Sequence, residues 1–245
     1  MNKRGIDISE WQGKIDFSKV KNAGIDCVIV RYADGSYCDK YFAYNMGECE
    51  RRGIHFGAYI YSRAINEAQA REEAQAIIKA CSMYNYDMPI YIDMEANELV
   101  GIANTIIDAF LDECDKAGVL GGIYANLNWF NNYINTRKYI ERPLWIAQYY
   151  ERLTHKNPGW FGMWQYTSQG SCPGISGNVD LNHVYVDYWN QKKKEKKEVS
   201  ESIKSKAVDV IFGKYGAGDE RVKKLGADYD AVQEIVNKLY DIIGK

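Results

Sequence analysis

The chain has 245 residues, of which 46% are hydrophobic and 26% are charged, so it can bury one large core or one large and one small core. Its longest apolar runs are far shorter than the about 18 residues of a membrane span, and residues 1–9 lack the apolar segment of a secretory signal. We therefore expect a soluble globular protein that is made in the cytoplasm and does not insert into a membrane.

The net charge of −2 is unevenly distributed. Residues 1–190 hold 18 Lys and Arg against 23 Asp and Glu, whereas residues 191–245 hold 13 against 10. The large part therefore shows no basic face of the kind that binds nucleic acid. Six cysteines and three histidines are scattered without the spacing of a zinc site or a Cys/His nucleophile pair. We expect free core thiols, no metal and no cofactor.

The first half of the chain alternates between strand and helix patterns. An early strand ends at Asp7, and a helix over Phe17 to Ala23 follows with Asp16 as its N-cap. Three further segments each run from a helix end through glycine into an apolar strand, namely 22–32, 51–61 and 116–126. Between these strands the apolar spacing predicts helices at 39–52, at 66–81 and at about 97–117.

Strict alternation through about residue 135 implies parallel βα units, which either close into a barrel or form an open sheet. No glycine-rich phosphate loop follows the first strand, and this favours the barrel. After residue 140, three aromatic strands follow without room for a full helix, namely RPLWIAQYY, GMWQYTS and GNVDLNHVY. We predict an α/β fold, an irregular TIM-like barrel of five βα units and three bare strands.

The stretch MPIYIDMEAN, residues 88–97, places two carboxylates at the end of a predicted strand over Pro89 to Asp93. Because side chains alternate along a strand, Asp93 and Glu95 point the same way with Cα atoms about 6.6 Å apart, near the spacing of glycosidase acid pairs. Like charges this close raise the pKa of at least one carboxyl group, which gives a proton donor beside a base. A solvated strand end or half of a divalent metal site would also explain the pair.

If the barrel closes, carboxylates at strand ends share one rim. Asp7 ends the first strand, Asp93 and Glu95 end the fourth, and Asp180 ends the eighth. Four acids from three strands are therefore expected at the catalytic face, although Asp7 and Asp180 taken singly are also explained as helix caps.

Other side chains are expected at the same rim. Four tyrosines whose alternation points inward, Tyr59, Tyr61, Tyr124 and Tyr149, are suited to stacking on sugars or donating hydrogen bonds to them, and packing inside the barrel explains them equally well. Arg31 and Gln165 are polar residues on strands that should be buried, and a partner among the rim acids would explain both.

Several segments, in this order and spacing, resemble glycoside hydrolase family 25, the muramidases of phage and bacterial cell-wall lysins. They are GIDISEWQGKIDFSKV, VIVRY, GAYIY, IDME, GIYAN, LWIAQY and WQYTSQGSCPGISGNVDLN. The resemblance covers residues 4 to about 188. Family 18 chitinases share the D-x-E motif but carry a further Asp where Tyr91 stands. Ile60 and Tyr61 stand where family 25 often has His and Phe.

The resemblance implies hydrolysis of the β-1,4 bond between N-acetylmuramic acid and N-acetylglucosamine in peptidoglycan. Glu95 then matches the general acid, and Asp93 matches the acid that steers the substrate's own acetamido oxygen onto the anomeric carbon. Asp7 and Asp180 would shape the charge around the site. Two alternatives are a non-catalytic glycan-binding barrel and a metal-dependent hydrolase that uses the rim acids as ligands for Mg or Mn.

The C-terminal part differs from the barrel in composition and in its apolar spacing. QKKKEKKEVS, residues 191–200, is a charged linker or a helical extension, and three short amphipathic helices are expected over 201–245, divided by Gly216, Gly218 and Gly226. The segment 208–240 resembles a Cpl-7-type cell-wall-binding repeat. We therefore expect a catalytic barrel over 1–190 and a small helical module that binds walls or drives self-association, in a protein that acts on the cell wall after release.

Overall fold

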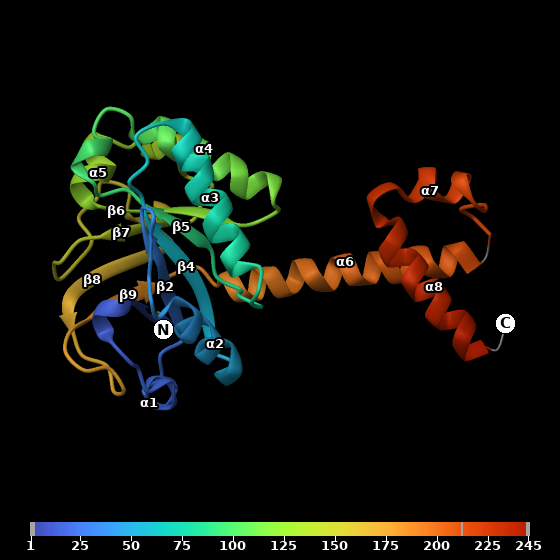
Figure 1. The fold of residues 1–245 in the computed structure, drawn as a ribbon, viewed down its shortest axis with the longest axis horizontal. Coiled ribbons are helices and arrows are strands. Elements are labelled where there is room, and N and C mark those ends of the chain that lie inside the picture. Colours follow the sequence, from blue (N-terminus) through green and yellow to red (C-terminus); the bar gives the residue numbers. More distant parts are fainter. Residues whose placement is uncertain (1–2, 212, 244–245) are drawn as a thin grey trace. The chain divides into compact units, whose positions relative to one another are not determined.

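The computed structural model describes residues 3–211 and 213–243, without the side chains of 191–201, 204 and 238–243. By its internal contacts the chain divides into two compact units, Met1–Trp189 and Asn190–Lys245. None of the helices in the described residues combines the length and the apolar character that crossing a membrane requires. Figure 1 shows the elements in chain order.

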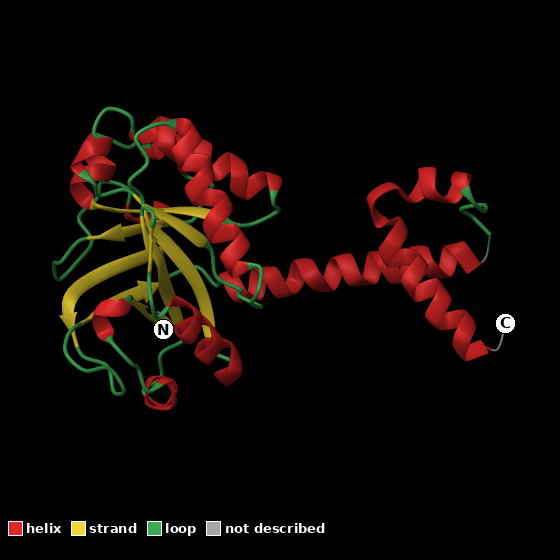
Figure 2. Ribbon diagram, viewed as in Figure 1, coloured by secondary structure: helices red, strands yellow, loops and turns green. Residues whose placement is uncertain are grey.

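The first unit contains five strand–helix pairs: β1 (Lys3–Ile8) with α1 (Phe17–Asn22), β2 (Cys27–Asp34) with α2 (Phe42–Arg52), β4 (His55–Tyr61) with α3 (Glu67–Cys81), β5 (Ile90–Asp93) with α4 (Ala103–Lys116), and β6 (Gly121–Asn126) with α5 (Leu127–Asn132). Three strands follow without an intervening α-helix: β7 (Leu144–Ala147), β8 (Met163–Gly170) and β9 (Val179–Val184). Figure 2 shows helices packed along part of the outside of the strands. The prediction of five βα units and three bare strands is confirmed.

Eight of the nine described strands close into a barrel. β1 pairs with β2 on one side and with β9 on the other, which completes the circle. All neighbouring barrel strands run parallel except β9, which is antiparallel to both β1 and β8. The remaining strand, β3 (Tyr37–Cys38), pairs only with β2 and lies outside the circle.

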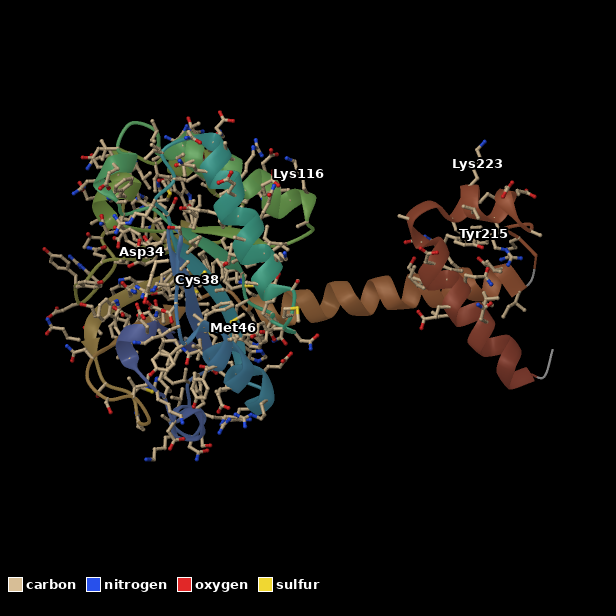
Figure 3. The ribbon with its side chains drawn as sticks, viewed as in Figure 1. Asp34, Cys38, Met46, Lys116, Tyr215 and Lys223 are labelled. Carbon is tan, nitrogen blue, oxygen red and sulfur yellow. The ribbon has the colours of Figure 1, made fainter. Side chains whose placement is uncertain are left out.

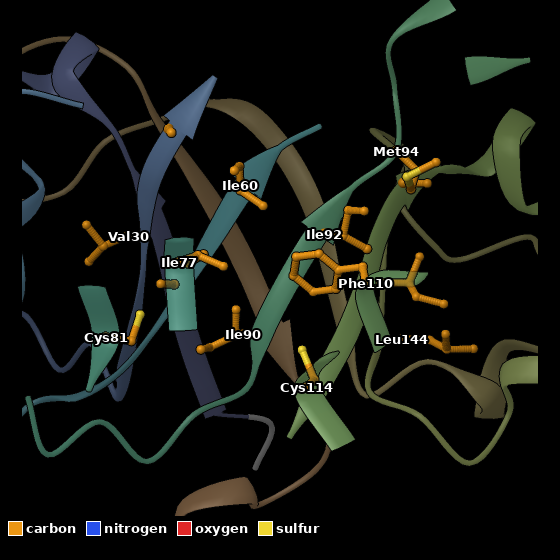
Figure 4. Packing of buried hydrophobic residues seen from close by; sticks show 14 of the residues in the cluster. Val30, Ile60, Ile77, Cys81, Ile90, Ile92, Met94, Phe110, Cys114 and Leu144 are labelled. Atoms are coloured by element: carbon orange, nitrogen blue, oxygen red, sulfur yellow. The ribbon is translucent and has the colours of Figure 1, made fainter. Parts of the chain in front are cut away.

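The outer faces of the strands pack against the helices. Figure 4 shows Ile90 and Ile92 of β5 beside Ile77 of α3 and Phe110 of α4, and all four side chains are fully buried. Burial of a side chain of this size stabilises the fold by about 1.5 to 3 kcal/mol. This apolar layer fixes which face of each strand points into the barrel, because side chains alternate along a strand.

A second apolar cluster fills the barrel interior near the N-terminal ends of the parallel strands. Tyr91 and Trp145 lie with ring centroids 5.2 Å apart, and the Tyr91 hydroxyl lies 3.5 Å from the Met163 sulfur. Tyr188, just after the last strand, packs into the same cluster. Residue 122 must be glycine, since a Cβ atom there would lie 2.6 Å from the Tyr91 ring.

Two predicted helices begin later than expected. The helix predicted over 97–117 is interrupted, because residues 97–99 form a 3-10 turn and Gly101 has a φ of +90° before α4 begins at Ala103. The helix predicted over 39–52 begins only at Phe42, and its first residues instead follow the β2–β3 hairpin.

Four further 3-10 turns lie in the connections: η1 (Glu10–Gln12), η3 (Thr136–Tyr139), η4 (Pro158–Trp160) and η5 (Gly226–Asp228). All six cysteines are free thiols, and five of them are buried as expected. Cys38 on the hairpin, labelled in Figure 3, is exposed and corrects the expectation of a core thiol.

The second unit has its own small core. The end of α6 (Tyr188–Ile211) packs with α7 (Asp219–Leu225) and α8 (Tyr229–Ile243) through six buried residues, namely Ile203, Ala207, Val210, Leu225, Val232 and Val236. Tyr215 packs against this core, and both Tyr215 and Lys223 are labelled in Figure 3. The predicted linker 191–200 falls within α6, and its side chains lie outside the described residues.

Candidate active site

The barrel brings the four predicted carboxylates to one rim. Asp7 is the penultimate residue of β1, Asp93 is the last residue of β5, and Glu95 follows two residues after Asp93. Asp180 does not end its strand as predicted; it is the second residue of β9. It reaches the same rim because β9 is antiparallel, and it lies directly opposite Asp7 in the β1–β9 pair.

Glu95 is held by the strand next to its own. The side-chain amide of Asn126, the last residue of β6, donates a 2.8 Å hydrogen bond to Glu95 Oε1. The orientation of this amide is fixed, since its oxygen accepts from the backbone N–H of Trp129 as the N-cap of α5. Burial raises the pKa of Glu95, and the hydrogen bonds from Asn126 offset part of that rise.

Asp93 is almost completely buried, with 4% of its surface exposed, and its Oδ1 has no hydrogen-bond partner in the described part of the chain. Burial, and then the charges of Glu95 and Asp7, raise the pKa of Asp93 well above its usual range. A buried carboxylate oxygen without a donor is costly, by about 1 to 3 kcal/mol or more. Water or a ligand at the rim would supply the missing donor.

Asp7 is equally buried but fully bonded. The Gln165 amide donates to both of its oxygens, at 3.1 and 3.0 Å, and the Asn182 amide donates to Oδ2 at 2.7 Å. Gln165 and Asn182 are cross-strand partners on β8 and β9, so their amides approach Asp7 together. Burial and the nearby Asp180 raise the pKa of Asp7, while the two amides oppose the rise.

The two amides are in turn oriented by aromatic donors. The Trp145 indole N–H donates to Asn182 Oδ1 at 2.7 Å, and the hydroxyls of Tyr124 and Tyr149 donate to Gln165 Oε1, both at 2.9 Å. Because an indole nitrogen is only a donor, Asn182 must present its N–H groups to Asp7. Asp7 therefore accepts hydrogen bonds from both amides.

Asp180 completes the cluster with a different environment. Its side chain is partly exposed, and burial raises its pKa to about 6, with a smaller contribution from the charge of Glu95. Like charges directly opposite each other in an antiparallel pair are destabilising. The pair of Asp7 and Asp180 therefore costs stability that the surrounding barrel must offset.

Arg31 does not find the partner that its sequence position suggested. Its guanidinium pairs with Asp39 at 3.2 Å and with Glu10 at 3.4 Å, and neither acid was among the predicted rim carboxylates. Asp39 also accepts the backbone N–H of Glu10, so Arg31 fixes the η1 turn beside β1. Its charge still lowers the pKa of Asp93, although other effects outweigh it. Gln165, by contrast, donates hydrogen bonds to Asp7, which is one of the predicted rim acids.

The four tyrosines divide into two groups. Tyr124 and Tyr59 lie inside the barrel, where their rings pack against Trp145 with centroids 4.4 and 6.1 Å away. Tyr61 is half-buried with the Arg63 guanidinium 4.5 Å from its ring centre. Tyr149 is 53% exposed, so its ring is accessible to a ligand at the rim. Packing thus accounts for Tyr59 and Tyr124, and Tyr149 is left as the open aromatic surface.

Three residues of the site were missed in the sequence. Asn126 and Asn182 stand within motif segments and face inward, but asparagine near a strand end is also typical of turns and helix caps. Trp145 lies in an aromatic strand, where a ring is equally typical of core packing. The signal that would have found them is the parity of the strand positions: Trp145, Gln165 and Asn182 all point into the barrel.

Fold and site together define an α/β barrel with a cup of carboxylates at its catalytic rim. Burial raises the pKa of Glu95, one of these acids, and three further carboxyl groups lie around it at the same rim. Such a set is suited to protonating a leaving group while stabilising positive charge that develops beside it.

Residues 6–175 match the glycosyl hydrolases family 25, and the chain belongs to this family. Residues 206–240 match the CW_7 repeat. The chain is 27% identical over 228 residues to an autolytic lysozyme of Clostridium acetobutylicum, covering 92% of this chain and 64% of that protein.

Two solved structures share the barrel. The modular autolysin LytC of Streptococcus pneumoniae, solved in complex with a synthetic peptidoglycan ligand, aligns with a TM-score of 0.66 and 31% identity over 74% of this chain and 46% of LytC. The CTP1L endolysin aligns with a TM-score of 0.70 and 27% identity over 79% of this chain and 70% of the endolysin. The chain thus spans 64% and 46% of the lengths of the lysozyme and of LytC. The family prediction is confirmed.

Proposed function

We propose that the chain is a peptidoglycan hydrolase that cleaves the β-1,4 bond between N-acetylmuramic acid and N-acetylglucosamine. Membership of family 25 and the likeness to an autolytic lysozyme support this activity. The proposal rests on two carboxyl groups at the end of β5. Glu95 accepts a hydrogen bond from Asn126, and the buried Oδ1 of Asp93 has no hydrogen-bond partner among the described residues.

Glu95 is the general acid of the proposed reaction. Its carboxyl group donates a proton to the glycosidic oxygen as the bond to the anomeric carbon breaks. Burial raises its pKa, so a larger fraction of the enzyme carries that proton near neutral pH. The bond from Asn126 keeps the carboxyl group in one orientation for the transfer.

Asp93 receives the acetamido N–H of the muramic acid residue in this proposal. The hydrogen bond would satisfy Oδ1 and turn the acetamido oxygen toward the anomeric carbon, where it forms the new bond as the leaving group departs. Asp7 and Asp180 add negative charge that favours the positively charged transition state over the neutral substrate.

Mass spectrometry of purified peptidoglycan after digestion tests this function. We expect new reducing ends on muramic acid, which identify both the bond and the reaction class. Reducing ends on glucosamine would contradict the bond assignment. A protein that binds the glycan without releasing any product would support a non-catalytic glycan-binding barrel instead.

We further propose that the CW_7 repeat holds the enzyme on the cell wall. The repeat has its own buried core and belongs to a separate compact unit, so anchoring and chemistry can be separated. Anchoring raises the concentration of the barrel at an insoluble substrate.

Removal of residues 191–245 tests this second role. The remaining chain retains Tyr188 and Trp189, which belong to the barrel core. We expect lysis of whole cells to fall far more than cleavage of soluble fragments, and wall pull-down to fail. If light scattering instead shows that the full chain is an oligomer and wall binding survives the truncation, the repeat serves self-association.

A further inference from the structure

A cavity of about 560 Å³ lies between the segment 130–140 and the loop that joins β7 to β8. None of the four rim carboxylates lines it. Both segments that line the cavity nevertheless start next to the rim. The first follows Asn126, which donates to Glu95, and the second includes Tyr149, which donates to Gln165. A ligand in this cavity would contact the two segments that leave the catalytic rim.

The charge of this cavity is unusual for the barrel. Arg137 and Lys156 line it, both are exposed, and neither forms an ion pair within the described residues. No aspartate or glutamate is among its described lining residues. A neighbouring cleft between α3, α4 and η3 shows the opposite arrangement, because its cations pair with acids, as Arg142 does with Asp115. Unpaired cations without acids favour an anionic ligand.

A buried histidine lines the same cavity. His155 is only 4% exposed, and its Nδ1 accepts the backbone N–H of Asn157 at 3.1 Å. Burial lowers the pKa of His155, a backbone hydrogen bond with Asn157 opposes this effect, and the charge of Lys156 adds to it. The ring thus adds a polar group to the wall beside Lys156.

The remaining lining is apolar and amide-bearing. Trp160 is partly buried with its ring 6.0 Å from that of His155, and Ile140 is 44% exposed. Asn131 and Asn135 add exposed side-chain amides. A phosphate polymer would use the cations but leave the apolar surface without contacts. A short peptide with carboxylates and aliphatic side chains would use the cations, the amides and the apolar surface.

We propose that this cavity binds the peptide that peptidoglycan strands carry, with a peptide carboxylate between Arg137, Lys156 and His155. The inference rests on the proposed function, since it supposes that peptidoglycan is the substrate. It adds a contact to the peptide beside the glycan contacts at the rim. The enzyme would therefore prefer strands that still carry their peptides.

The test compares two substrates with the full-length protein and the double variant Arg137→Ala/Lys156→Ala. One substrate is solubilised peptidoglycan with its peptides, and the other is the same material after an amidase has removed them. Because both cations are exposed, their charge pairs with a peptide are weak, and we expect a loss of about tenfold in kcat/KM on the peptide-bearing strands. On the peptide-free strands, the variant and the wild type should agree within about twofold.

The matched control is Lys79→Ala, which removes an exposed lysine on α3 that has no ion pair in the described residues. It should leave both rates unchanged, and thermal unfolding should show all variants folded. Calorimetry should detect binding of the released peptide to the wild type and not to the double variant. The proposal would be overturned if the double variant lost equal activity on both substrates or lost none on either. It would also be overturned if a phosphate polymer, and not free peptide, displaced the bound peptide. A wild type that cleaves neither substrate would contradict the proposed function instead.

Discussion

The two ends of the barrel interior are built from the same strands and have opposite chemistry. Near the N-terminal ends of the parallel strands, Tyr91, Met163 and Tyr188 pack without charge. Two positions after Tyr91 and Met163, the same two strands present Asp93 and Gln165. Burial stabilises the first layer, whereas it raises the pKa values of the carboxyl groups in the second.

This difference indicates a division of labour within a single core. The apolar end supplies the free energy that keeps acids such as Asp7 and Asp180 opposite each other at the other end. Substitutions at the two ends should therefore have opposite signatures: loss of stability at the apolar end, and loss of activity with unchanged or improved stability at the rim.

Tyr188→Ala should give the largest effect. Tyr188 is 5% exposed and fills the space beside Gly162, so its removal leaves a cavity and lowers the free energy of unfolding by about 3 to 5 kcal/mol. Urea denaturation measures the change. Tyr150→Ala is the matched control at the rim, because Tyr150 is 70% exposed, and it should shift stability by less than about 0.5 kcal/mol. Similar losses in the two variants would remove the contrast.

Glu95→Gln should act on chemistry alone. The substitution keeps the shape and removes the proton, so turnover on cell walls should fall by at least about 100-fold. The bond from Asn126 can be kept, and thermal unfolding should be nearly unchanged. A variant that retains a third of the wild-type rate would disprove the role of Glu95 as general acid.

Asp93→Asn separates catalysis from binding at the same rim. If Asp93 steers the acetamido group in the transition state, kcat should fall strongly while KM changes little. Steady-state kinetics on soluble glycan strands measure both constants. An increase in KM with an unchanged kcat would make Asp93 a binding residue only.

Asp180→Asn should stabilise the barrel in a pH-dependent way. The pKa of Asp180 rises from 3.8 to about 6 on folding, so the folded state binds more protons than the unfolded state between these values. The contribution of protonated Asp180 to the free energy of unfolding is fully present below pH 4 and is lost as pH rises through 6. The variant should therefore gain roughly 1 to 3 kcal/mol at pH 7 and nothing at pH 4. Equal gains at both pH values would contradict this.

Chelation should have the smallest effect. The proposed reaction uses carboxyl groups and the substrate's acetamide, so activity should survive EDTA. Activity that is lost on chelation and restored by Mg or Mn would instead support a metal-dependent hydrolase built on the rim acids. The assay is turnover before and after dialysis against EDTA.

The sequence was sufficient for the barrel because its signals are local. A few neighbouring residues are enough to encode an apolar strand that begins after a glycine. The same holds for the helix that has Asp16 as its N-cap. Asp7, Asp93 and Glu95 follow from the rule that strand ends share a rim. The direction of β9 was not predictable in this way, because it depends on the long-range pairing of Asp180 with Asp7.

The partners of Arg31 show the same limit. A buried arginine demands an acid, but which acid it meets depends on the hairpin that brings Asp39 back toward Glu10. The break at Gly101 shows a second limit, since apolar spacing continued through a segment whose backbone the glycine turns away from the helix. Periodicity predicts the kind of element well and its ends poorly.

The closing strand has a consequence for the order in which the protein is synthesised. Asp7 leaves the ribosome before Asn182, which donates a hydrogen bond to it and lies 175 residues later in the chain. Until β9 docks, Asp7 lacks this donor and β1 has an unpaired edge. Completion of the barrel and assembly of the carboxylate cup are thus one event, and chains released before residue 184 should be inactive rather than partly active.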